Sequence, residues 1–245
     1  MGVTRRVPEN SYSLYAAFLD LRNVPVLVVG GGAVAARKIT GLLASGARVT
    51  AIAPEFDSQF DPLLQAQKPA RASSSPEPRT PVSGRCRLVR RKFRDSDLNK
   101  HRIVYALTND LKLNRHVAAL AGKQGILVNV ASPPDAGNMH VPAGFRRGRL
   151  QIAISSGGAS AALAKSLREY LERIVGPEWG QLAGMLEARR ARLLAEINNP
   201  EKRACLLHVL GSPRWVRMIK KRGLKQTALA MDAVIAATKR LNGIV

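Results

Sequence analysis

The stretch VPVLVVGGGAVAARKITGLLASGARVTAIAP, residues 24–54, decides the fold of this chain. Residues 24–29 are apolar and β-branched, which predicts a short buried strand that ends at a run of glycines. Residues 33–45 carry apolar side chains at helical spacing and predict a helix, with Gly46 as its stop. Residues 48–54 predict the next strand. A strand, a glycine-rich turn, a helix and a strand in this order form a βαβ unit.

Strands and helices continue to alternate after this unit. Further apolar segments predict strands at residues 86–93, 102–108, 125–131 and 150–156, and a helix at residues 111–122. This alternation is typical of the α/β class. We expect a Rossmann-like, doubly wound, mostly parallel sheet with helices on its faces.

Two regions depart from the alternation. Residues 57–85 are rich in proline, serine and arginine, which predicts a flexible surface insertion. From Pro177 the pattern is helical almost to the end, with Pro200 and Pro213 at helix boundaries. We therefore expect a helical C-terminal domain.

The composition excludes several classes of protein. The 2 cysteines are too few for a disulfide framework, and with 4 scattered histidines they show no metal-ligand spacing, so no metal site is predicted. The longest apolar run, residues 24–36, is too short and too rich in glycine to span a membrane. These features predict a cytoplasmic protein without membrane association.

The net charge of +22 is spread over both halves of the chain and predicts an anionic partner. Composition leaves three explanations open, which are nucleic acid, a small polyanionic substrate and a general basic bias of the source proteome. The segment Arg214–Lys225, RWVRMIKKRGLK, would be the place for nucleic acid, with one tryptophan among its basic residues.

The glycine-rich turn predicts a dinucleotide site. It matches the pattern G-x-G-x-x-G/A between a strand and a helix, where the backbone can approach a pyrophosphate at the positive helix end. The alternative is that the glycines merely turn the chain. The residues expected at the cofactor are Gly30, Gly31, Gly32, Ala33, Val34 and Ala35.

Other residues bear on which dinucleotide binds. Glu55 is the only acidic candidate for the ribose hydroxyls, which favours NAD. Arg37 and Lys38 could instead bind the 2′-phosphate of NADP. Thr108 and Asn109 follow another predicted strand and are expected to contact the cofactor, although Asn109 could equally cap the next helix.

The stretch VNVASPPDAGNMHVP, residues 128–142, gathers polar side chains around two prolines. Ser132, Asp135 and His140 are the candidate catalytic residues, because a carboxylate or an imidazole can move a proton. The alternatives are structural. In these alternatives the prolines only end a strand, Asp135 only belongs to an ordinary turn, and His140 would be a buried histidine with its hydrogen bonds satisfied.

A second candidate site lies at residues 155–160, SSGGAS, where two hydroxyls and a Gly-Gly pair enter a helix. Such a helix start suits a carboxylate or a phosphate. The alternative is that Ser160 is an ordinary N-cap. Arg146, Arg147 and Arg149 precede this segment, either as a solvated face or as a grip for carboxylates.

Four motifs in this order resemble the precorrin-2 dehydrogenase family, from about Tyr12 to Leu194 with an interruption at 57–85. The motifs are residues 24–54, YALTND at 105–110, VNVASPPDAGNMHVPA at 128–143 and IAISSGGASAALAKSLREYLE at 152–172. The resemblance implies an NAD-dependent enzyme of sirohaem synthesis that oxidises precorrin-2 to sirohydrochlorin. Some family members also insert ferrous iron.

The resemblance also implies a domain organisation and partners. A Rossmann-like NAD-binding domain (1–138), a dimerisation module (139–175) and a helical domain (176–245) would form a homodimer. The tetrapyrrole substrate carries several carboxylates, so it accounts for the basic surface and disfavours nucleic acid as a partner. The residues then expected to bind the substrate are Asn129, Arg146, Ser155, Ser156 and Gly157.

One position departs from the family pattern. Family members commonly have an aspartate where this chain has Ser132. A serine without an activating partner is no general base at neutral pH, so Asp135 or His140 would replace it, or the proton would leave to water. Dehydrogenation depends mainly on alignment of the hydride and can survive the change, whereas metal insertion is more exposed to it. The alternative function is a nucleotide- or tetrapyrrole-sensing module with a basic nucleic-acid-binding tail.

Overall fold

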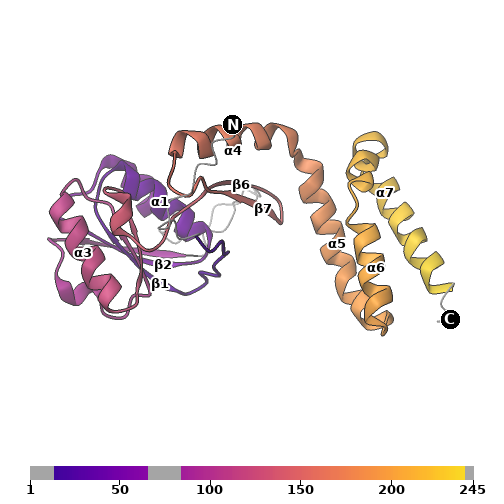
Figure 1. Ribbon diagram of the computed structural model, residues 1–245, viewed down its shortest axis with the longest axis horizontal. Coiled ribbons are helices and arrows are strands. Elements are labelled where there is room, and N and C mark those ends of the chain that lie inside the picture. The colour runs from indigo at the N-terminus through magenta and orange to yellow at the C-terminus, as the bar shows by residue number, and fades with distance from the viewer. Residues whose placement is uncertain (1–13, 66–83, 241–245) are drawn as a thin grey trace, which may run out of the picture. The chain divides into compact units, whose positions relative to one another are not determined.

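The computed structural model describes residues 14–65 and 84–240 of the chain (Figure 1). Their contacts divide the protein into two compact units. The first unit comprises Tyr15–Val141, and the second continues from Pro142. The glycine-rich turn therefore belongs to the first unit, and the helical C-terminal region belongs to the second.

A five-stranded parallel sheet forms the centre of the first unit. The spatial order is β3-β2-β1-β4-β5, so the winding direction reverses between β1 and β4. This order confirms the predicted Rossmann-like, doubly wound fold. The strands are β1 (Pro25–Val29), β2 (Arg48–Ala53), β3 (Arg85–Arg90), β4 (Ile103–Ala106) and β5 (Leu127–Val130).

Helices bury both faces of this sheet. In β1, the Val26 side chain packs into the core formed with α1 (Ala33–Ala44), and the next side chain, Leu27, packs into the core formed with α3 (Leu111–Lys123). Because both faces are covered, the central strands are continuous apolar runs without a polar alternation. This is why the sequence identifies them so clearly.

The structure corrects the start of the expected insertion at 57–85. A 3₁₀ helix, η1 (Ser58–Phe60), and a short helix, α2 (Asp61–Gln65), occupy its first part. The Phe60 side chain is 1% exposed and packs edge-on against Phe56, with ring centroids 4.9 Å apart. Phe60 and the partly buried Leu63 thus tie this polar stretch to the core, while residues 66–83 lie outside the described part of the chain.

The outer edge of β5 is covered by the chain itself. After the 3₁₀ helix η3 (Pro134–Ala136), the backbone N–H groups of Asn138 and Met139 both donate to the Val128 carbonyl at 3.0 Å. The Asn138 side chain accepts a hydrogen bond from the Val128 N–H at 2.7 Å and donates to the Ile126 carbonyl at 3.1 Å. The outward groups of Val128 and the Ile126 carbonyl are therefore satisfied without another strand.

The second unit begins with an antiparallel hairpin of β6 (Ala143–Arg147) and β7 (Leu150–Ile154). Of these two strands, only β7 was expected from the sequence. The helix α4 (Ala161–Ile174) packs against the hairpin. The hairpin and α4 fall within residues 139–175, for which a dimerisation module was expected.

Three helical segments complete the second unit. They are α5 (Pro177–Glu196), α6 (Pro200–Leu210) and α7 (Arg214–Arg240). The backbone of α7 breaks at Gly223, where φ is 76° and ψ is 174°. The core side chains include Leu193, Leu210, Trp215 and Met231. No helix in the described ranges is long and apolar enough to cross a membrane.

Candidate active site

The glycine turn fills a narrow space between the carboxyl ends of β2 and β4. Gly30 has a φ of 136°, and its N–H donates to the Ile52 carbonyl at 2.9 Å. A Cβ atom at Gly30 would lie 2.5 Å from the Leu107 carbonyl oxygen, and one at Gly31 would overlap the Glu55 carbonyl oxygen. Neither position can hold a side chain without moving a neighbouring strand end.

The N-terminus of α1 is open directly above this turn. Gly32 is the N-cap and provides no side-chain hydrogen bond, and the first turn of α1 carries no acidic residue. A Cβ atom at Gly32 would meet no atom within 4 Å. The first N–H groups of a helix have no partner inside the helix, so these amides are available to an anion.

The next residues complete the cradle formed by the glycine turn and the start of α1. Ala33 and Val34 are exposed at the helix start, and Ala35 is fully buried, where its small side chain lets α1 approach the sheet. These features fit a dinucleotide pyrophosphate.

Glu55 and Thr108 lie on opposite sides of the glycine turn. Glu55 follows β2. Its side chain is exposed, and its own backbone carbonyl lies against Gly31. Thr108 follows β4, where its backbone nitrogen would be 3.3 Å from a Cβ atom on Gly30. Arg37 is exposed on α1, and burial lowers the pKa of the neighbouring Lys38.

Asn109 is exposed and is not the cap of α3. Asp110 takes that position, and its carboxylate accepts hydrogen bonds from the Lys112 and Leu113 N–H groups at 2.9 and 3.0 Å. The capping explanation for Asn109 is therefore wrong. Its place at the carboxyl edge of the sheet stays compatible with a cofactor contact.

The predicted catalytic residues follow β5. Ser132 is exposed, and Asp135 is exposed on η3, a few residues further along the same segment. His140 is exposed, so it is not the buried histidine of the structural alternative. Asn129 is half-buried on β5, and its amide nitrogen donates to the Met139 carbonyl at 2.9 Å, which holds the returning chain against β5.

Asn114 was not identified from the sequence. It is 0% exposed on the inner face of α3 and hydrogen-bonds to groups at the ends of both β4 and β5. A signal for it exists, because Asn114 shares the buried stripe of α3 with Val117, Ala118 and Ala121 at helical spacing. A polar residue in such a stripe must find partners inside the protein.

In the second unit, the SSGGAS segment forms the turn before α4. The Ser156 hydroxyl donates to the Ser160 carbonyl at 2.9 Å and accepts from the Ser160 N–H at 3.0 Å. The Ser160 hydroxyl accepts from the Leu163 N–H, so Ser160 is an ordinary N-cap. The Ser155 hydroxyl accepts from the Gly157 N–H at 3.1 Å and stays exposed.

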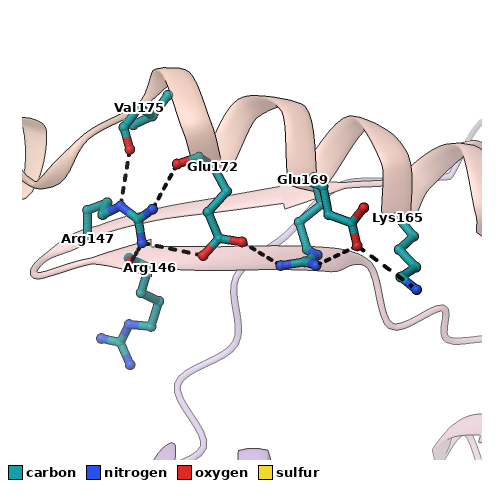
Figure 2. A network of polar contacts seen from close by, with 7 residues as sticks. Arg146, Arg147, Lys165, Glu169, Glu172 and Val175 are labelled. Carbon is teal, nitrogen blue, oxygen red and sulfur yellow. Dashed lines mark hydrogen bonds and ion pairs between the residues drawn. The ribbon is translucent and has the colours of Figure 1, made fainter.

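The arginines of the hairpin differ in their surroundings, as Figure 2 shows. Arg147 reaches α4, where it donates to the carbonyls of Val175 at 3.1 Å and Glu172 at 2.9 Å. The Glu172 carboxylate also pairs with Arg168, which continues the network along α4. Arg146 is exposed, and its guanidinium points away from these contacts. Arg146 is therefore better placed than Arg147 to meet a ligand.

Other chemistry has little support in the described residues. Neither Cys86 nor Cys205 forms a disulfide, and burial raises the pKa of the Cys86 thiol to about 11, which makes it a poor nucleophile. No cluster of histidine, cysteine, aspartate or glutamate suited to a metal ion occurs within residues 14–65 and 84–240.

The doubly wound sheet, the glycine cradle and the open helix end define a dinucleotide-binding α/β protein. The family model "Putative NAD(P)-binding" matches residues 17–143, and "Sirohaem biosynthesis protein central" matches residues 147–174. Precorrin-2 dehydrogenase of Priestia megaterium is 31% identical over 87% of this chain and 97% of its own length. The chain belongs to the precorrin-2 dehydrogenase family.

Further relatives agree with this assignment. A siroheme synthase of Thioalkalivibrio sulfidiphilus is 35% identical over 77% of this chain, and the match covers 35% of that relative. The chain thus spans about a third of the length of the siroheme synthases that it matches. A solved structure of SirC, a precorrin-2 dehydrogenase, superposes with a TM-score of 0.69 at 28% identity, covering 90% of this chain and all of that one.

The alternative of a sensor with a nucleic-acid-binding tail is not favoured. None of these relatives is a sensor or a nucleic-acid-binding protein by name. The tryptophan of the basic segment, Trp215, is 2% exposed in the helical core, and its indole N–H donates to the Val209 carbonyl. It is therefore unavailable to stack on a base.

Proposed function

We propose that this protein oxidises precorrin-2 to sirohydrochlorin with NAD as the hydride acceptor. The observation that carries the proposal is the match to a precorrin-2 dehydrogenase over 97% of that relative, combined with the intact pyrophosphate cradle. In this reaction precorrin-2 loses a hydride and a proton, NAD becomes NADH, and the ring system gains a double bond.

The glycine turn and the start of α1 would hold the cofactor. Backbone N–H groups after Gly32 receive the pyrophosphate, and Glu55 accepts hydrogen bonds from the ribose hydroxyls on the β2 side. The same carboxylate would repel a 2′-phosphate. We therefore propose NAD over NADP as the cofactor, although Arg37, the candidate for binding a 2′-phosphate, follows the glycine turn in the sequence. Thr108 and Asn109 then border the cofactor on the β4 side.

For proton transfer we propose Asp135. Its carboxylate is exposed on η3 after β5, at the carboxyl edge of the sheet where ligands of doubly wound folds bind. Ser132 would contribute a hydrogen bond and no base, because a hydroxyl without an activating partner does not ionise at neutral pH. His140 is the second candidate for the proton, since it is also exposed.

For the substrate we propose the residues that the sequence indicated. Arg146 would pair with a carboxylate, and the exposed Ser155 hydroxyl, which accepts a hydrogen bond from the Gly157 N–H, would donate to another. Asn129 retains its carbonyl oxygen for a pyrrole N–H, because its amide nitrogen is engaged by Met139. The net charge of +22 would draw a polycarboxylate to the protein.

We also propose that the protein is a homodimer joined through α4 and that it is cytoplasmic. The side chains of Leu163, Leu167, Tyr170 and Ile174 lie on one stripe of α4 and are 42–59% exposed. The hairpin contacts a different stripe, where Arg147 pairs with Glu172 and where Ala164 is buried. An amphipathic helix that turns its apolar stripe outward calls for a partner, and C2 symmetry is the commonest solution.

The test of the function is a direct assay. Purified protein with precorrin-2 and NAD should produce NADH and sirohydrochlorin in equal amounts, followed by absorbance at 340 nm and by the spectrum of the tetrapyrrole. NADP should be the poorer cofactor. Absence of NADH formation under conditions in which a known precorrin-2 dehydrogenase is active would refute the proposal.

A further inference from the structure

Asn114 is one of two polar side chains that are fully buried in the described residues, the other being Thr227. Its amide is completely satisfied. The oxygen accepts from the Thr108 hydroxyl at 2.7 Å and from the Thr108 N–H at 3.2 Å. The nitrogen donates to the Thr108 carbonyl at 2.9 Å and to the Ser132 carbonyl at 3.0 Å. A single side chain thereby joins the ends of two neighbouring strands.

The two strand ends are those on the β4 side of the winding reversal. Thr108 follows β4, and its backbone lies against Gly30 of the cofactor turn. Ser132 follows β5 and begins the segment that carries Asp135. In doubly wound sheets a dinucleotide lies across the reversal, with one mononucleotide on each side. Because Glu55 assigns the adenosine ribose to the β2 side, the nicotinamide half falls to the side that Asn114 organises.

We propose that Asn114 is a positioning residue that sets the floor of the nicotinamide half of the site. It fixes the distance between the Thr108 and Ser132 backbones, and its own hydrogen bonds go to these two residues and not to the glycine turn. This inference rests on the proposed function for its kinetic consequences. Its binding consequences need only that the protein binds NAD.

The variant Asn114→Asp isolates this role. This variant keeps the size of the side chain and the side-chain oxygen that accepts hydrogen bonds from Thr108. It replaces the NH2 donor by a second oxygen, which faces the Thr108 and Ser132 carbonyls. Those two carbonyls then repel the new group, and the strand ends separate. Thr227→Val is the matched control, because Thr227 is equally buried but hydrogen-bonds only within α7, to the Gly223 carbonyl at 2.8 Å.

The decisive measurement compares two ligands that share the adenosine, the pyrophosphate and the second ribose. NAD carries the nicotinamide ring, and ADP-ribose lacks it. By calorimetric titration of the full chain, Asn114→Asp should weaken NAD binding about tenfold and leave ADP-ribose binding within about twofold of wild type. Thr227→Val should change neither. An equal loss for both ligands, or no loss for NAD, would overturn the inference.

Steady-state kinetics supply a second readout. A misplaced nicotinamide lowers kcat by about a hundredfold, because hydride transfer depends on alignment. The milder Thr108→Val, which removes the 2.7 Å hydrogen bond to Asn114 and the hydroxyl's contacts with the Asp110 backbone but keeps the Asn114 amide, should show a smaller fall in the same direction. If wild type binds NAD but never oxidises precorrin-2, the proposed function fails alone, and the two-ligand comparison still decides the role of Asn114.

Discussion

In the proposed mechanism, Asp135 and Ser132 divide between them the tasks that the family resemblance assigns to one aspartate. Asp135 has an exposed carboxylate on η3. The Ser132 backbone carbonyl accepts a hydrogen bond from Asn114, and the Ser132 side chain is exposed. The segment is anchored by its backbone, so either side chain can be replaced without loss of a buried contact. Kinetic effects of such replacements can therefore be read as chemistry.

We expect Asp135→Asn to lower kcat for NADH formation by about a hundredfold, because removal of a general base typically costs that much. Thermal stability should stay within about 1 °C of wild type, since the residue is exposed. Asp61→Asn, at another exposed aspartate in a short helix, is the matched control and should keep full activity. Equal activities of the two variants would assign the proton to His140 or to water.

Ser132→Asp addresses metal insertion. A carboxylate at this position can take pyrrole N–H protons and attract a ferrous ion, so we expect the variant to form sirohaem from sirohydrochlorin and iron faster than wild type, by about tenfold or more. The Soret band of the product provides the measurement. A wild-type rate as high as that of the variant would contradict this expectation.

At the scale of elements, the β1–α1–β2 unit could be predicted from the sequence because local propensity and burial agree there. β6 was not expected, since Ala143–Arg147 contains a glycine and two arginines and shows no apolar alternation. It is a strand because β7 pairs with it, and Gly144 lets the Ile152 carbonyl approach closely. The roles of Asn114 and Phe60 could not be predicted from the sequence for a related reason, because they depend on partners distant in the sequence.

The glycine turn yields a pair of contrasting variants. Gly31→Ala places a methyl group against the Glu55 carbonyl, so we expect it to destabilise the protein by about 2–3 kcal/mol and to abolish NAD binding. Gly32→Ala enters open space, so stability should change by less than about 0.5 kcal/mol while NAD binding weakens. Denaturant unfolding and NAD titration separate the two effects. Normal NAD affinity in Gly32→Ala would move the pyrophosphate away from this helix end.

The 3₁₀ helix η2 (Asp95–Leu98) predicts a pH dependence of stability. Asp97 accepts two hydrogen bonds from Arg91 at 2.6 and 2.7 Å and one from the Arg94 N–H at 2.8 Å, and its side chain is 10% exposed. The hydrogen bonds from Arg91 are the main reason why its pKa lies below the ordinary value. The carboxylate therefore binds its proton less readily in the folded state than in the unfolded state.

This stabilisation is present above the unfolded pKa, near 4, and is lost as the pH falls through the lower pKa of the folded state. We expect Asp97→Asn to cost about 2 kcal/mol of unfolding free energy at pH 7 and less at pH 3. Urea unfolding at both pH values measures the difference. A cost that does not diminish at pH 3 would show that the lost packing, and not the charge, matters.

At the scale of the whole molecule, we predict that the protein forms a homodimer through α4. Leu167 lies on the exposed apolar stripe, and Leu167→Glu would bring like charges together across a two-fold axis. We expect this variant to be monomeric in sedimentation at micromolar concentration, while wild type is dimeric. Lys165→Gln, on the same helix but outside the stripe, is the control and should remain dimeric. A monomeric wild type would refute the proposed use of α4.

The sealed edge of β5 limits how these molecules can aggregate. Open parallel sheets present hydrogen-bonding edges that can recruit a strand from a neighbour and propagate into fibrils. Here the return of the chain through Asn138 and Met139 satisfies the outward groups of Val128. At high concentration, strand addition at this edge is therefore hindered. Asn138→Ala would expose the edge again, and Asn138 is not among the residues that we place in the catalytic machinery.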